Sequence, residues 1–187
     1  MNTNKLTTLP AEIGQLKALL TLQIGYNLFT TFPLSVCNSK SITNLWINNN
    51  QIPSIPTQFA QLTSLYQFQA GYNVISSAPV ANLTNLWVVN LRNNLLTSLP
   101  AIAISSPLRT LRVNYNNITS IPSQISSLPL TTLDISYNSY LTSLPSTFNK
   151  LTQLTSLSVT GDSLDCTSLA LIAQMNIATC NGCTPCV

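Results

Sequence analysis

The chain has 187 residues, of which 45% are hydrophobic and only 6% are charged, with a formal net charge of +3. Charged residues usually make up about a quarter of a soluble protein, so Asn, Ser, Thr and Gln must cover most of this surface. We expect no nucleic-acid partner, because that function needs a dense stripe of Lys and Arg. We also expect no membrane span, because no apolar run reaches about 18 residues.

One sequence pattern recurs from the start of the chain to about residue 165. Its clearest copy, residues 108–122, follows the scheme L-x-x-L-x-L-x-x-N-x-L-x-x-L-P, with Ile or Val at some of the Leu positions. Leu111 and Val113 alternate with polar residues, as in a half-buried strand. The copies, aligned on the polar residue, fall at Asn4, Asn27, Asn50, Asn73, Asn94, Asn116, Asn138 and Asp162. Such a unit cannot bury its apolar face alone and must stack on its neighbours.

Each copy predicts one short strand followed by a return segment. The strands are expected near residues 22–24, 45–47, 68–70, 89–91, 111–113, 133–135 and 157–159. Successive copies run in the same direction and therefore pair as a parallel sheet. The return segments begin at Pro and place Ile13, Val36, Phe59, Ile125 or Phe148 at the same apolar position. Because Pro can open a helix but not continue one, we expect short 3₁₀ turns or irregular coil there.

This pattern resembles the leucine-rich repeat family, closest to its class of 22–24 residues with Leu-Pro after the Asn. The resemblance implies an α/β leucine-rich repeat solenoid, a right-handed horseshoe with a parallel β-sheet on its concave face and short 3₁₀ or irregular convex segments. Residues 1–164 would form about seven full repeats after an N-terminal partial repeat, and residues 165–187 a Cys-rich C-terminal cap. The partial repeat lacks its strand, so we expect either a fragment of a longer chain or a frayed natural start. Self-association through this uncapped edge is a further expectation.

The repeated Asn residues have a predicted structural role. A side-chain amide offers donors and an acceptor to backbone groups that are left free where the chain turns inward. Stacked copies would form a ladder through the solenoid, and Asp162 replaces Asn in the last copy. The expected ladder residues are Asn27, Asn50, Asn73, Asn94, Asn116 and Asn138.

The pattern ends after Asp162, where apolar spacing predicts a short amphipathic helix over residues 167–175 that covers the end of the core. Four of the five cysteines follow in this region: Cys166, Cys180, Cys183 and Cys186. Extracellular members of the family often carry a disulfide-stapled cap here, and four cysteines allow three pairings. A zinc site is the alternative, because Cys180-x-x-Cys183 has ligand-like spacing.

The positions of the strand that face away from the core gather most of the side chains suited to binding. Both Trp residues, five of the six Tyr residues and all three Arg residues fall on this face. Trp, Tyr and Arg are enriched at binding hot spots. The candidate ligand-binding residues are Trp46, Tyr66, Tyr72, Trp87, Arg92, Arg109, Arg112, Tyr115 and Asp134.

Two interpretations of this face are open. The three Arg residues come from adjacent repeats, so their guanidiniums can converge on an acidic group. Alternatively, the Tyr residues pack along the ladder edge and Arg112 pairs with Asp134. An exposed Trp on a strand face has no evident structural purpose.

Catalysis is not expected, since the chain has no His and only four carboxylates, which lie apart. No cofactor is implied. The resemblance implies a non-enzymatic recognition module, extracellular or at the cell surface, that binds a protein ligand through the sheet. One alternative is a carbohydrate-binding surface protein, since aromatic and amide side chains suit sugars. Another is a fragment or scaffold of a longer receptor, and a weaker one is binding to ice or mineral surfaces by the Thr, Ser and Asn rows.

Overall fold

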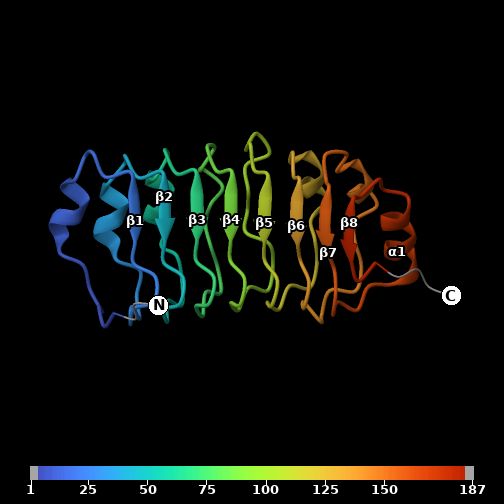
Figure 1. The fold of residues 1–187 in the computed structure, drawn as a ribbon, viewed down its shortest axis with the longest axis horizontal. Helices are drawn as coiled ribbons and strands as arrows, with labels where there is room; N and C mark the ends of the chain where they lie inside the picture. The colour runs from blue at the N-terminus through green and yellow to red at the C-terminus, as the bar shows by residue number, and fades with distance from the viewer. Residues whose placement is uncertain (1–3, 184–187) are drawn as a thin grey trace.

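The structure, a computed structural model, describes residues 4–183. Its strands lie side by side in one open parallel sheet, in the order of the sequence (Figure 1). The eight strands are β1 (Thr21–Gln23), β2 (Asn44–Trp46), β3 (Gln67–Gln69), β4 (Val88–Asn90), β5 (Thr110–Arg112), β6 (Thr132–Asp134), β7 (Ser156–Ser158) and β8 (Thr179–Asn181). The predicted solenoid fold is confirmed.

The register of the sheet repeats the register of the sequence pattern. Leu45 of β2 pairs with Phe68 of β3, and Phe68 pairs with Val89 of β4. All three central residues are fully buried, while their flanking residues remain partly accessible. The alternation of side chains in a strand thus separates one core face from one outward face, which we call the sheet face.

Short 3₁₀ turns form most of the side opposite the sheet face. They are η1 (Ala11–Gln15), η2 (Leu34–Asn38), η3 (Thr57–Gln61), η4 (Ser123–Ser127) and η5 (Phe148–Lys150). The first four directly follow a Pro whose carbonyl accepts a hydrogen bond from the third residue after it, as in Phe59 N to Pro56 O at 3.0 Å. An apolar residue of each turn from η2 to η5 is buried, with Val36 and Phe59 fully inaccessible, whereas Ile13 of η1 is only partly buried. The expectation of short turns rather than long helices is therefore confirmed.

From Asn50 onward the predicted ladder residues make the same hydrogen bonds in every repeat, whereas Asn27 donates only to carbonyls of its own repeat. Asn116 is typical: its Oδ1 accepts from Leu96 N at 2.9 Å, and its Nδ2 donates to Val113 O at 2.9 Å and to Leu91 O at 3.0 Å. Leu96 and Leu91 belong to the preceding repeat, so each amide connects two turns of the solenoid. These bonds satisfy buried backbone groups that have no partner in a strand.

The residue before each ladder Asn has a left-handed backbone conformation. Its φ lies between 53° and 57° at six positions and is 76° at Gly161. Asn tolerates this conformation comparatively well, whereas a bulky residue is uncommon there. Four of the six positions nevertheless carry Tyr. The residues are Tyr26, Asn49, Tyr72, Asn93, Tyr115 and Tyr137.

The C-terminal end of the core is covered by α1 (Cys166–Ala173), at the position that the sequence predicts (Figure 1). Asp165 caps the helix by accepting a hydrogen bond from Ser168 N at 2.8 Å. Ile172 is buried against the last repeat. The expected number of seven strands is wrong, because β8 pairs with β7 in parallel register. Its central residue is Cys180, so β8 lacks the large apolar central residue that marked the other strands.

The cysteines of this region form disulfides rather than a zinc site. Cys180 bonds to Cys183, and Cys166 is also disulfide-bonded. Both members of the proposed Cys-x-x-Cys ligand pair are thereby used, which overturns the zinc alternative. Cys186 lies outside the described residues. Cys37 is a free, buried thiol in η2, and burial raises its pKa to about 11, as fits an unreactive side chain.

Candidate functional site

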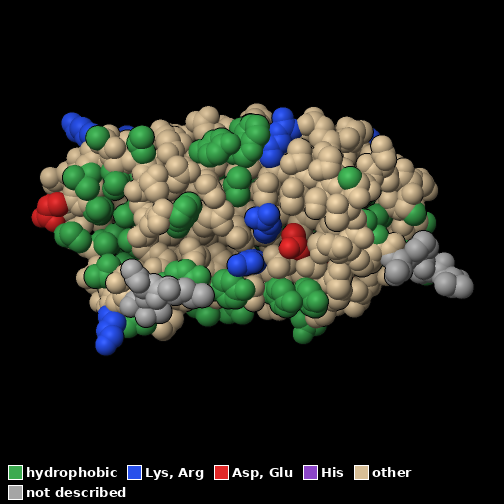
Figure 2. Space-filling model, viewed as in Figure 1, with side chains coloured by type: hydrophobic (Ala, Val, Ile, Leu, Met, Phe, Trp, Pro, Cys, Tyr) green, Lys and Arg blue, Asp and Glu red, His purple; other side chains and the backbone are tan. Residues whose placement is uncertain are grey.

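The sheet face presents three parallel zones of side chains. The residue immediately before each strand belongs to the upstream rim. The outward-facing residues of the strands form the centre. The residues with left-handed backbone conformation, which follow the strands, form the downstream rim. Figure 2 shows this side of the molecule as mostly uncharged, with separate hydrophobic groups and few charges among them. Because successive strands are in register, residues at the same position in adjacent repeats become lateral neighbours.

The upstream rim contains a stack of three side chains from adjacent repeats. The rings of Tyr66 and Trp87 are nearly parallel, with centroids 5.8 Å apart. The guanidinium of Arg109 lies over the ring of Trp87, 5.3 Å from its centroid. Arg109 Nη1 donates to Pro129 O at 2.6 Å and also to the side chain of Gln153. The stack is therefore held in place, while Tyr66 and Trp87 remain 43% and 37% exposed.

The downstream rim carries the left-handed Tyr residues. Tyr115 and Tyr137 stack with centroids 4.2 Å apart, and the hydrogen bond to Tyr137 raises the pKa of Tyr115. Arg92 lies 4.9 Å from the ring centroid of Tyr72. These Tyr residues are exposed. The alternative in which they pack along the ladder edge holds in part, because they contact one another, but their outer surfaces face solvent.

The centre of the sheet face holds the charged pair Arg112 and Asp134. They are register partners on β5 and β6. Within the described residues, however, no ion pair joins them, and Asp134 Oδ1 instead accepts from Ser136 Oγ at 2.6 Å and from Ser136 N at 3.2 Å. The alternative interpretation, in which Arg112 pairs sideways with Asp134, is therefore wrong.

Two of the three Arg residues lie at opposite rims of the sheet face, which argues against the interpretation in which all three converge on one acidic group. Arg109 is held on the upstream rim by Trp87, whereas Arg92 lies against Tyr72 on the downstream rim. The reason is local: each long side chain covers the nearest exposed ring, since a cation over a ring gains about 0.5–1 kcal/mol even at an exposed site.

A small cleft opens on the sheet face between β2 and β4, with a volume of about 240 Å³. Its lining combines the predicted residues Trp46, Tyr72 and Arg92 with Tyr26, Gln67 and Gln69. Gln67 and Gln69 are not among the binding residues predicted from the sequence. The sequence does contain a sign of the cleft itself, because Gly71 occupies the position that Asn48 and Arg92 fill in the adjacent repeats.

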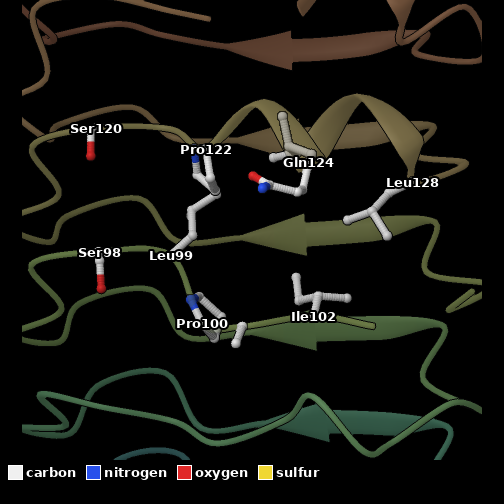
Figure 3. A pocket seen from close by; sticks show the side chains of 10 residues that line it. Ser98, Leu99, Pro100, Ile102, Ser120, Pro122, Gln124 and Leu128 are labelled. Carbon is white, nitrogen blue, oxygen red and sulfur yellow. The ribbon is translucent and has the colours of Figure 1, made fainter. Parts of the chain in front are cut away.

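A second hollow lies on the opposite side, beside η4, with a volume of about 390 Å³ (Figure 3). It forms because the segment after Pro100 has no 3₁₀ turn, so that Ile102 and Leu128 border an open space. Ser98, Ser120 and Gln124 are its polar lining residues. It holds no titratable side chain and none of the predicted binding residues.

Comparisons with known proteins agree with this architecture. The family model described as leucine rich repeat matches residues 106–164. A leucine-rich repeat protein of Leptospira interrogans has 30% sequence identity and a TM-score of 0.86, over 93% of this chain and 46% of that protein. The plant peptide hormone receptor RGFR1, in complex with RGF2, has 29% identity and a TM-score of 0.62, over 84% of this chain and 30% of the receptor.

A structure of PEPR1–AtPEP1 has 25% identity and a TM-score of 0.80, over 96% of this chain and 27% of the matched chain. No curated protein sequence matches. This chain thus spans about half, or less, of the length of these structural relatives.

The repeat, the parallel solenoid and these matches together define a leucine-rich repeat solenoid. Residues 106–164 match the leucine-rich repeat family model, and the solenoid resembles that of the leucine-rich repeat protein of Leptospira interrogans. One of these neighbours, RGFR1, is a plant peptide hormone receptor, and the expectation of a non-enzymatic protein agrees with that similarity. Among residues 4–183, no helix has the length and apolar character that a membrane crossing requires.

Proposed function

We propose that this chain is a recognition module that binds a protein ligand through the sheet face, with Trp87, Arg112 and the rim aromatic residues as its principal contacts. The observation that carries the proposal is the exposure of Tyr66, Trp87 and Tyr115 on one face. Large aromatic side chains supply much of the binding energy of protein interfaces. The peptide complex of the similar receptor RGFR1 supports the same type of partner.

The backbone supports a binding role for the downstream rim. Asn49 and Asn93 have the same left-handed conformation as Tyr72 and Tyr115. A residue held in a sparsely populated region costs of order 1–3 kcal/mol, and Asn lowers this cost more readily than Tyr. Backbone stability alone therefore favours Asn at these positions, whereas the exposed Tyr rings enlarge the surface offered to a ligand.

The charge of the sheet face indicates an acidic contact on the ligand. Arg112 has no ion-pair partner within the described residues and projects from the centre of the face. A carboxylate on the ligand can bind a guanidinium with two parallel hydrogen bonds. Association should then weaken as salt rises, because exposed charges are screened over about 8 Å at physiological ionic strength.

The test is a binding screen against purified extracellular protein domains, followed by substitution. Arg112→Ala should weaken a specific hit at least tenfold and reduce its dependence on salt. Trp87→Ala should weaken it by a similar factor without changing the salt dependence. Lys150→Ala is the matched control, because it removes one positive charge from η5, away from the sheet face. A hit that is equally weakened by Lys150→Ala and by Arg112→Ala would refute the assignment of the face.

We further propose an extracellular or cell-surface location. Two observations support it: the disulfide between Cys180 and Cys183, and the similarity to receptor proteins. Disulfides persist in oxidising compartments and are rare in the cytosol. The test is alkylation of free thiols in freshly isolated protein. An extracellular location predicts that Cys180 and Cys183 are protected from alkylation. Complete labelling of both cysteines would contradict it.

A further inference from the structure

We infer that the cleft between β2 and β4 is a saccharide subsite that holds one pyranose ring. This is a binding activity beyond the proposed recognition of a protein ligand. It rests on the shape of the cleft and on the hydrogen-bonding groups that line it.

The cleft exists because Gly71 has no side chain. Asn48 and Arg92 occupy the equivalent position in the repeats on either side and form its lateral walls. A Cβ atom added to Gly71 would lie 3.0 Å from Arg92 Cγ. The resulting volume of about 240 Å³ is below the roughly 300–1,000 Å³ of pockets for drug-sized ligands. It therefore suits a ligand of one ring, or one ring of a longer chain.

The aromatic walls suit the apolar face of a sugar ring. Trp46 of β2 and Tyr72, which follows β3, both line the cleft. The Trp46 indole Nε1 is buried and has no hydrogen-bond partner. An unsatisfied buried donor costs about 1–3 kcal/mol, so Phe would fill the same wall at lower cost. Stability thus gives no reason for the indole, whereas its larger ring offers more surface for a ligand to stack on.

The polar walls suit hydroxyl groups in particular. Within the described residues, the side-chain amides of Gln67 and Asn48 make no hydrogen bond. Asn90 Nδ2 donates to Gln69 Oε1 at 2.9 Å, which leaves the Gln69 Nε2 donors free and holds both amides in place. An amide can donate and accept, and so can a sugar hydroxyl. The cleft lining contains no carboxylate, and Arg92 is its one charged member.

The experiment is a calorimetric titration of the intact chain with defined oligosaccharides. The panel contains oligomers of glucose, mannose, galactose, N-acetylglucosamine and galacturonic acid, each used up to about 10 mM, because a single-ring site with a Kd near 1 mM gains only about 4 kcal/mol. We expect at least one oligomer to bind with one site per chain. A salt-sensitive preference for galacturonic acid would assign a binding role to Arg92.

Substitutions then locate the site. Trp46→Ala and Gly71→Ser should each weaken binding at least tenfold, while Trp46→Phe should weaken it less than threefold. Gln67→Ala should weaken binding about fivefold, and its matched control is Gln23→Ala, a change on the same face in β1 but outside the cleft. Far-ultraviolet circular dichroism verifies the fold of each variant, and the Gln67 and Gln23 pair provides the test if Gly71→Ser does not fold.

The proposal is overturned if no oligomer binds, or if Trp46→Ala and Gln67→Ala bind as tightly as the unaltered chain. Its failure is distinct from failure of the protein-binding proposal, which depends on Arg112 and Trp87. A protein hit that persists after enzymatic removal of the partner's glycans, with no oligosaccharide bound, would support the recognition of protein and reject the saccharide subsite.

Discussion

Asp162 occupies the last position of the Asn ladder, and replacing it with Asn should stabilise the protein. Asp162 Oδ1 accepts from Asn138 N at 2.7 Å, but its Oδ2 is buried without a partner. The ladder residue before it shows what an amide would do there, since Asn138 Nδ2 donates to Val113 O and Ile135 O. The Asp162 side chain does not share this orientation, because its Oδ1 accepts from Asn138 N, whereas the Oδ1 of Asn138 accepts from Ile118 N, two residues after Asn116. In the ladder orientation, the amide introduced by Asp162→Asn would donate to the carbonyls of Ile135 and Val159.

The size of the effect follows from the pKa of the Asp162 carboxyl. Burial raises this pKa from 3.8 to about 7, against the lowering effect of the Asn138 N–H, and the charge of Asp134 adds to the rise. A pKa rise of this size corresponds to a cost of about 4 kcal/mol for the ionised carboxylate in the folded chain. Because Asp162 is partly accessible to solvent, screening reduces the cost of its charge to roughly 2 kcal/mol.

The sign of the pH dependence is set by which state ionises first. Below pH 3.8 the carboxyl is protonated in both states and carries no penalty. Between pH 3.8 and about 7 the Asp162 carboxyl is ionised in the unfolded chain but still protonated in the folded chain. The free energy of unfolding therefore falls as pH rises. Above that range the penalty is constant. Asp162→Asn should therefore gain roughly 2 kcal/mol more at pH 8 than at pH 3.5.

Urea denaturation from pH 3.5 to 8.5, followed by circular dichroism, measures this difference. Glu12→Gln is the matched control, because it removes one carboxylate at the far end of the solenoid, in η1. The control should leave the free energy of unfolding almost unchanged at both extremes of pH. The reasoning is refuted if Asp162→Asn is less stable than the unaltered chain at pH 8, or if its advantage is the same at pH 3.5.

Three further outcomes are expected. Asn116→Ala should lower the free energy of unfolding by about 2–4 kcal/mol in urea denaturation, because it leaves Leu96 N without an acceptor and removes three more hydrogen bonds. Gly161→Ala should cost about 1–2 kcal/mol in the same assay, since its Cβ would lie 2.7 Å from Tyr137 Cδ1 at a φ of 76°, and Tyr137→Ala in the same chain should recover part of this loss. Self-association through the β1 edge, where Leu20 is 58% exposed, should appear in light scattering as a mass that rises with concentration. The mass should be lower in Leu20→Glu, and a constant monomer mass of the unaltered chain would exclude self-association.

Much of this fold can be predicted from the sequence because a solenoid is nearly one-dimensional. Each repeat contacts mainly its neighbours, so the spacing of Asn27, Asn50 and Asn73 sets both the register of the strands and the position of the turns. The apolar spacing after Asp162 likewise indicates α1, which begins one residue before the predicted start. These features depend on local alternation and period, which the residues display directly. β8 escaped prediction because Cys180 does not mark a strand by its hydrophobicity alone.

The arrangement of the binding surface depends on tertiary structure. The sequence determined that Trp87, Arg109 and Arg112 project from the sheet face, since strand alternation fixes the side on which a residue lies. Only the folded chain decided that Arg109 stacks on Trp87 and that Arg112 stays unpaired. Long side chains have many rotamers of similar energy, and the rings and carbonyls brought close by neighbouring repeats select among them. The cleft over Gly71 has the same origin, because an absent side chain becomes a cavity only where side chains of adjacent repeats enclose it.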